Sequence, residues 1–167
     1  MVLKYLLTLV AAVFIIGFIT GEAYGSYSTA TEQPVSFSFL TGRSAERISP
    51  SDHILENDVH VFSDRVVLDI DAPFWASFTD TNSMDPVIDA GANSVEASPK
   101  SPDEIAVGDI ISFRTGLASG TIIHRVIEKG EDDEGVYFIT KGDNNPLQDP
   151  GKVRFEDIKG VVVAVIY

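Results

Sequence analysis

Three residues far apart in the sequence have the side chains that nucleophilic catalysis requires. Ser83, His124 and Asp149 follow one another in the chain as a hydroxyl, an imidazole and a carboxylate. A serine hydroxyl is a weak nucleophile at neutral pH and needs a base within hydrogen-bond reach. A histidine can accept its proton, while an acid fixes the imidazole tautomer and stabilises the imidazolium. These residue types therefore predict a serine-hydrolase triad, provided that the fold brings the three together.

The serine lies in a turn of unusual composition. The stretch TDTNSMDPVI, residues 79–88, contains Asn82 and Pro86, which are common turn formers, but a plain surface turn does not need Met84. We therefore expect Asn82 and Pro86 to fix the turn, Met84 to anchor it, and Ser83 to be presented at its surface.

The base and the acid are less distinctive on their own. His124 lies in the strand-like stretch IIHRV, whereas His53 and His60 lie in a polar lead-in and beside a turn. A lone histidine on a strand is more often structural than catalytic. Asp143 and Asp149 flank a polar turn, and their spacing does not fit a calcium-binding loop. Only their combination with the serine indicates an active site.

Length and composition restrict the class of protein. A chain of 167 residues, 44% of them hydrophobic, indicates one folded domain with an appendage. The 25 acidic and 12 basic residues give a formal net charge of −13, which argues against a nucleic acid partner. The sequence has no cysteine, so disulfides and thiolate metal sites are excluded. We expect neither a metal nor another cofactor.

The N-terminal residues 1–20 form a nearly unbroken apolar run with a single charge, Lys4. Such a run is near the lower limit for a helix that crosses a bilayer. A cleaved secretory signal is the alternative, because Ala23-Tyr24-Gly25 loosely fits a small-x-small cleavage site. Whether the run is a membrane anchor or a cleaved signal, Lys4 stays in the cytoplasm and the remainder of the chain is exported. Residues 21–53 are rich in Ser, Thr and Gly and are interpreted as a linker or loosely ordered lead-in.

The folded domain is expected over residues 54–167, and strand signals dominate it. Segments rich in β-branched and aromatic residues alternate with Gly, Asp and Pro, a pattern typical of antiparallel β structure. The predicted strands are 60–62 and 65–71, which form a hairpin, then 109–113, 121–128, 135–141 and 161–167. Residues 128–135 are predicted as an acidic turn, and the two strands that flank it are expected to pair antiparallel. Residues 154–158 are predicted as a short helix.

Four short stretches resemble, in their order, the motifs of type I signal peptidases. They are SMDP (83–86), GDI (108–110), IHRV (123–126) and TKGDNN (140–145), and the similarity covers about residues 76–166. They are similar to the archaeal and endoplasmic-reticulum branch, which has histidine where the bacterial branch has lysine. The resemblance implies a mainly β, antiparallel, barrel-like catalytic domain with one N-terminal transmembrane helix. It also implies a membrane-anchored serine endopeptidase that cleaves signal peptides from exported preproteins after a small residue.

The resemblance assigns a role to each residue of the expected site. Ser83 matches the nucleophile and His124 the general base, while Asp149 matches the third catalytic member and Asp143 a supporting acid. Thr81 stands where the family has a serine, whose hydroxyl joins the backbone N–H of Ser83 in the oxyanion hole. Met84 and Pro86 match residues that support the substrate site. The implied partners are the signal peptides of preproteins and the lipid bilayer, with the catalytic domain on the extracytoplasmic side.

The sequence departs from the family pattern, and other functions remain open. The usual Ser-Gly-Ser is Thr81-Asn82-Ser83, and Ala92 stands where an aspartate is usual. A Ser–Lys autoprotease of the repressor type is one alternative, but it needs a lysine at position 124. An inactive, membrane-tethered β module that binds an exported partner is the other.

Overall fold

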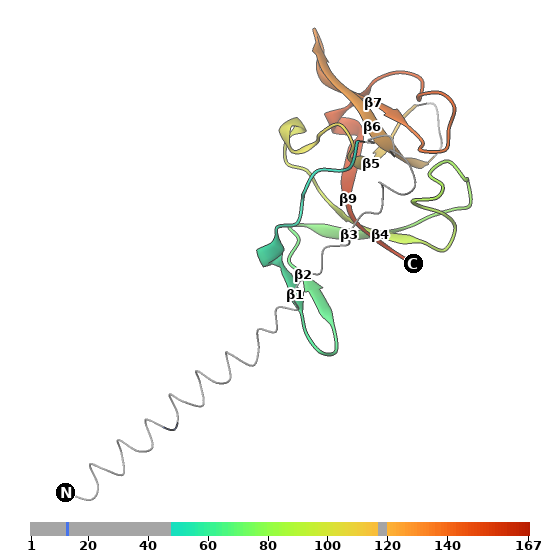
Figure 1. Ribbon diagram of the computed structural model, residues 1–167. Coiled ribbons are helices and arrows are strands. Elements are labelled where there is room, and N and C mark those ends of the chain that lie inside the picture. Colours follow the sequence, from blue (N-terminus) through green and yellow to red (C-terminus); the bar gives the residue numbers. More distant parts are fainter. Residues whose placement is uncertain (1–12, 14–47, 117–119) are drawn as a thin grey trace, which may run out of the picture. The chain divides into compact units, whose positions relative to one another are not determined.

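The computed structural model describes residues 13, 48–116 and 120–167, and these form a mainly β, antiparallel structure with short 3-10 turns (Figure 1). The expected anchor, residues 1–20, lies outside the described residues apart from Val13, and so does most of the lead-in. No helix in the described part of the chain combines the length and the apolar character needed to cross a membrane.

The chain divides into two compact units, and the described part of the first is Val13 and Glu56–Asp69. A 3-10 turn, η1 (Glu56–Asp58), precedes two short strands, β1 (Val59–Val61) and β2 (Val66–Leu68). The strands pair antiparallel, with Val59 opposite Leu68. The predicted hairpin in this region is therefore confirmed.

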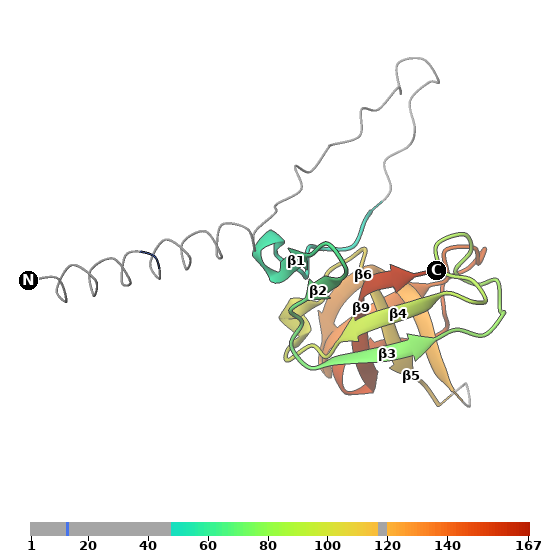
Figure 2. The same ribbon diagram turned by 90° about the horizontal axis from the view of Figure 1, so that it is seen from below.

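The described part of the second unit comprises residues 48–55, 70–116 and 120–167 and contains one antiparallel sheet (Figure 2). The strand order in the sheet is β3-β4-β9-β5-β6-β7-β8, so the C-terminal strand lies in its middle. The strands are β3 (Pro73–Ser77), β4 (Asn93–Ala97), β5 (Ile110–Arg114), β6 (Thr121–Asp132), β7 (Gly135–Lys141), β8 (Val153–Arg154) and β9 (Ile158–Ile166).

The sheet differs from the prediction in several ways. Its ladder has two ends, β3 and β8, so among the described residues it does not close as the barrel-like prediction requires. Strands β3, β4 and β8 were not predicted; the β4 sequence NSVEA carries polar and acidic residues that disfavour strands, and β8 has only two residues. The predicted helix at 154–158 is the 3-10 turn η3 (Phe155–Asp157).

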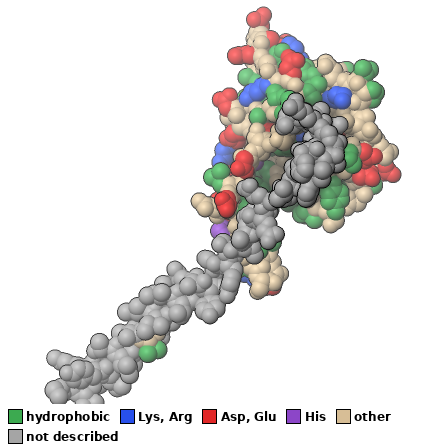
Figure 3. All heavy atoms as spheres, in the orientation of Figure 1, with side chains coloured by type: hydrophobic (Ala, Val, Ile, Leu, Met, Phe, Trp, Pro, Cys, Tyr) green, Lys and Arg blue, Asp and Glu red, His purple; other side chains and the backbone are tan. Residues whose placement is uncertain are grey.

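The predicted acidic turn at 128–135 is mostly strand. Strand β6 continues to Asp132 and β7 begins at Gly135, whose φ of 101° suits a tight turn. Figure 3 shows acidic side chains gathered at the tip of this hairpin, at the top of the view. Arg154 and Lys152 contact Asp132 and hold its pKa well below the usual value. These neighbouring cations offset the acidic repulsion that would otherwise favour a loop.

Two apolar clusters lie on the two faces of the central strands. Ile111, Phe113 and Phe138 are among the fully buried residues of the first cluster. The second contains Met84 and Ile110. Strand β5 contributes to both clusters because neighbouring residues of a strand point to opposite faces. The sheet therefore supports a packed layer on each side, and the second layer includes the methionine of the 79–88 turn.

Candidate active site

Met84 anchors the Ser83 turn in the apolar core. Met84 is 4% exposed and belongs to the second apolar cluster, while Ser83 itself is half-buried. The carbonyl of Met84 accepts hydrogen bonds from the amides of Val87 and Ile88, at 2.9 and 3.0 Å. Asn82 has a φ of 55°, a left-handed conformation that asparagine tolerates better than most residues. Thus Met84 anchors the turn, as expected, and Asn82 supplies the left-handed residue within it.

The turn after β7 holds the Ser83 turn from the side. The amide of Asn144 donates to the carbonyl of Ser83 at 3.0 Å, and its side-chain amide donates to the carbonyl of Asn82 at 2.9 Å. The amide of Asp143 contacts the Met84 sulfur at 3.4 Å. A Cβ atom on Gly142 would lie 2.6 Å from the Ser83 carbonyl oxygen. The close approach of the two turns therefore requires glycine at position 142.

His124 and Asp149 form a direct pair. His124 Nδ1 lies 2.6 Å from Asp149 Oδ2, and the two side chains are only 10% and 19% exposed. Thr140 Oγ1 donates to the same carboxylate oxygen at 2.7 Å, and the Asp149 amide donates to the Thr140 carbonyl at 2.8 Å. With its proton on Nδ1, His124 donates to Asp149 and keeps Nε2 free to accept a proton.

The second acid has a different partner. Asp143 accepts two hydrogen bonds from Arg125, Nε to Oδ1 at 2.7 Å and Nη2 to Oδ2 at 2.6 Å. Arg125 also donates to the carbonyl of Gly108 at 2.7 Å. Neighbouring residues on a strand point to opposite faces, so His124 and Arg125 engage separate acids. Asp143 thus belongs to a pair that joins the turn after β7 to the GDI stretch.

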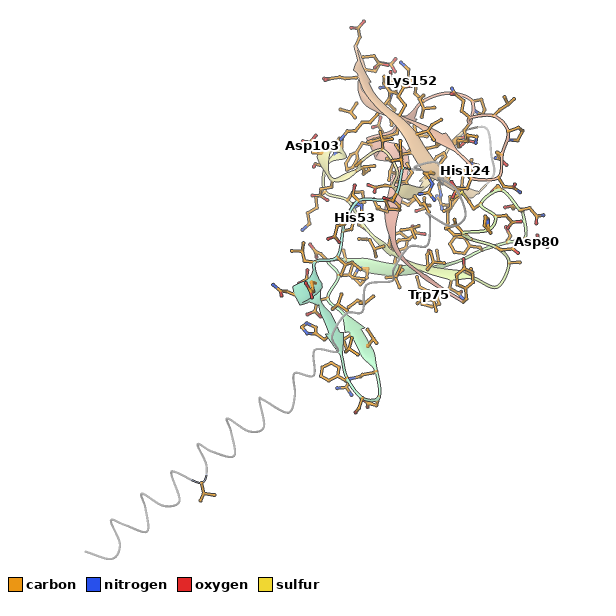
Figure 4. All side chains as sticks on the ribbon, viewed as in Figure 1. His53, Trp75, Asp80, Asp103, His124 and Lys152 are labelled. Carbon is orange, nitrogen blue, oxygen red and sulfur yellow. The ribbon has the colours of Figure 1, made fainter. Side chains whose placement is uncertain are left out.

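Ser83 and His124 line the same cavity, which has a volume of about 980 Å³ and is also lined by Thr81 and Met84. Thr81 Oγ1 lies 3.2 Å from Ser83 Oγ, within hydrogen-bond distance. In the described part of the chain, Ser83 and His124 share the cavity without a hydrogen bond between them. Figure 4 labels His124 on β6 and Trp75 on β3.

Pro86, Lys129 and Lys141 lie outside the lining of the cavity. Pro86 is exposed and is not among the residues that line the cavity, although its peptide bond with Asp85 is cis. Lys129 donates to the backbone carbonyls of Pro102 and Ile105, and neither it nor Lys141 lines the cavity. Within residues 48–116 and 120–167, no group of three acidic or histidine side chains is arranged to hold a metal ion.

Two contributors to the site were missed by the sequence reasoning. Thr140 donates to the Asp149 carboxylate, and Asn144 bridges the two turns. Both lie in the stretch TKGDNN, so the motif marked this segment of the chain but did not assign a role to either residue. Sequence alone could not show which donor meets which acceptor, because the partners are far apart along the chain.

Comparisons with known proteins relate the chain to signal peptidases over part of its length. No family model matches it. An uncharacterized protein of Methanocaldococcus jannaschii is 52% identical over 44 residues, which is 26% of this chain and 22% of that protein. The human signal peptidase complex catalytic subunit SEC11C is 44% identical over 50 residues, 29% of this chain and 26% of the subunit. Signal peptidase I W of Bacillus subtilis is 28% identical over 79 residues, 47% and 41% of the respective chains.

These similarities are partial, since the matches span between 22% and 41% of the relatives' own lengths. They support a relationship to the signal peptidase family and suggest a peptidase.

Proposed function

We propose that this protein is a membrane-anchored serine endopeptidase that removes signal peptides from exported preproteins after a small residue. The observation that carries the proposal is the cavity shared by the Ser83 turn and His124, whose other ring nitrogen is paired with Asp149. The partial similarity to signal peptidases supports the substrate class. We assign the protein to the archaeal and endoplasmic-reticulum branch because the proposed base is a histidine rather than a lysine.

In the proposed reaction, His124 Nε2 accepts the proton of Ser83 as its oxygen attacks the scissile carbonyl. Asp149 holds the imidazole through Nδ1 and stabilises the imidazolium that forms. The backbone N–H of Ser83 and the Thr81 hydroxyl stabilise the oxyanion, an interaction worth about 3 kcal/mol per donor. The imidazolium then protonates the leaving amine. Finally, His124 activates a water molecule that hydrolyses the acyl-enzyme and restores Ser83.

The proposal places the catalytic domain on the extracytoplasmic side of the membrane, tethered by the apolar segment at residues 1–20. A preprotein's cleavage site lies next to the bilayer, so an enzyme held at that surface meets its substrate in two dimensions. Signal peptides and lipid are the proposed partners.

The test is processing of a model preprotein by membranes that contain the full chain, with Ser83→Ala prepared in parallel. We expect cleavage after a small residue by the natural chain, and intact preprotein with the variant. A serine-reactive probe should label the natural chain and not Ser83→Ala. Equal processing by both membranes would contradict the proposed nucleophile. Labelling without processing would keep the serine enzyme but contradict the substrate.

A further inference from the structure

A buried carboxylic acid lies in the wall of the cavity that contains Ser83. Glu96 on β4 is fully buried, yet it is among the residues that line this cavity, as is Ser112 on β5. Glu96 Oε1 accepts a hydrogen bond from Ser94 Oγ at 3.1 Å, and Oε2 accepts one from Ser112 Oγ. The proposed catalytic steps do not use any of these three side chains.

The acid has polar neighbours but no cation. In the described part of the chain, no lysine, arginine or histidine forms an ion pair with Glu96. Burial raises the pKa of Glu96, and the hydrogen bonds from Ser112 and Ser94 only partly oppose that shift. Neutral hydroxyls satisfy lone pairs but leave the negative charge uncompensated, which is costly in a buried site. A cation brought by a ligand would remove this cost.

An aromatic ring lies beside the acid in the wall of the same cavity. Phe74 on β3 lies directly opposite Glu96 in the sheet and lines the same cavity. A Cβ atom on Gly160 would lie 2.5 Å from the Phe74 ring and 2.9 Å from Glu96 Oε2. The absence of a side chain at position 160 therefore lets an aromatic ring and a carboxylate lie together. Both groups attract ammonium and guanidinium ions, the ring through its π face.

We propose that Glu96, Ser112 and Phe74 form an acidic subsite that selects a basic side chain, lysine or arginine, in the bound peptide. The inference rests on the proposed function, because the ligand is the peptide to be cleaved. The incoming cation takes the place of the Ser112 hydroxyl on Glu96 Oε2, and its aliphatic stem packs against Phe74. Asp89 and Lys159 also line the cavity, but both are exposed and opposite in charge, so Glu96 determines the local preference.

The test uses alanine-based peptides with one variable residue at each of the five positions before the scissile bond. Lysine is compared with acetyl-lysine and norleucine, which keep the aliphatic stem and lack the charge. The enzymes are the full natural chain, Glu96→Gln, and Asp89→Asn as the control for removing an exposed acid from the same cavity. At one position we expect lysine to raise kcat/KM at least about tenfold over norleucine and acetyl-lysine, as a partly buried charge pair should. The preference should fall to about one in Glu96→Gln and persist in Asp89→Asn.

The outcomes separate the subsite from the proposed function. Cleavage without a preference for lysine at any position, or a preference that Glu96→Gln retains, would overturn the subsite. If no peptide is cleaved, binding of the same peptides to Ser83→Ala is measured by fluorescence polarisation. Tighter binding of the lysine peptide that is lost on adding Glu96→Gln would support the subsite and contradict the peptidase. If Glu96→Gln does not fold, equal cleavage of the lysine and acetyl-lysine peptides by the natural chain still overturns the subsite, and a lysine preference that persists in Asp89→Asn supports it.

Discussion

Replacing each of the two acids after β7 with asparagine should have different effects. Asp149→Asn should mainly reduce activity, and Asp143→Asn should mainly reduce stability. Asp149 accepts hydrogen bonds from His124 and Thr140 on one carboxylate oxygen, at 2.6 and 2.7 Å. In Asp149→Asn, an amide N–H can face His124 Nδ1 and force the proton onto Nε2. That tautomer cannot accept the proton of Ser83, so we expect kcat/KM to fall by about 10³–10⁴. This loss corresponds to roughly 4–5.5 kcal/mol of transition-state stabilisation, at about 1.36 kcal/mol for each factor of ten.

The matched replacement, Asp143→Asn, should act first on stability. It breaks a bidentate pair with Arg125 whose side chains are 16% and 18% exposed, and it leaves the guanidinium without its carboxylate. Breaking a buried pair costs about 3–5 kcal/mol, and partial exposure places this one at the lower end. We therefore expect the thermal midpoint to fall on the order of ten degrees. Asp149→Asn, in which the amide has nearly the same shape, should change the midpoint less.

The assay measures peptide cleavage by each variant together with its thermal unfolding by calorimetry. Thr140→Val removes only one of the two donors to Asp149 and should reduce kcat/KM by about tenfold, which provides an intermediate point. Asp149→Asn that keeps activity within tenfold of the natural chain would refute the role of Asp149. Identical losses of activity and stability in Asp149→Asn and Asp143→Asn would refute the assignment of the two acids to separate partners.

Three further predictions concern the serine turn and its surroundings. Thr81→Val should lower kcat by about 10²–10³ with KM unchanged, whereas Thr81→Ser should keep most of the activity, as measured by steady-state kinetics. Gly142→Ala should lower both activity and thermal midpoint because its Cβ would meet the Ser83 carbonyl at 2.6 Å, while Gly116→Ala, which meets nothing within 4 Å, should change neither. Glu96→Gln should stabilise the protein at neutral pH, because burial raises the pKa of Glu96 above its usual 4.5 and penalises the ionised form. Since the penalty falls on the ionised form, the difference in midpoint should shrink as the pH falls through the raised pKa and be nearly gone below the usual 4.5, in scans at several pH values, and a difference independent of pH would contradict it.

Much of the β structure could be predicted from local patterns. Strands β5, β6, β7 and β9 are runs of β-branched and aromatic residues bounded by turn formers, and such runs indicate strands without any knowledge of the partner. Strand β4 could not be predicted in this way, because its NSVEA sequence becomes a strand only between β3 and β9. There Ser94 and Glu96 are buried against each other and Ser112, a compensation that no local pattern contains.

The sequence by itself determined which side chains could do chemistry. It contains a serine beside a methionine in a turn, a histidine in a predicted strand and two acids around one polar turn, and these residue types suit nucleophilic chemistry without thiols. Their order and spacing also carry the resemblance to signal peptidases.

Only the tertiary structure decided which of these groups meet. The pairing of β6 with β7 brings the turn after β7 beside His124, so Asp149 reaches the imidazole while Asp143 reaches Arg125. Contacts between residues 18 and 25 positions apart depend on strand order and register, which local sequence does not encode. For the same reason, the buried Glu96 beside Phe74 becomes visible as a feature of the cavity only after folding.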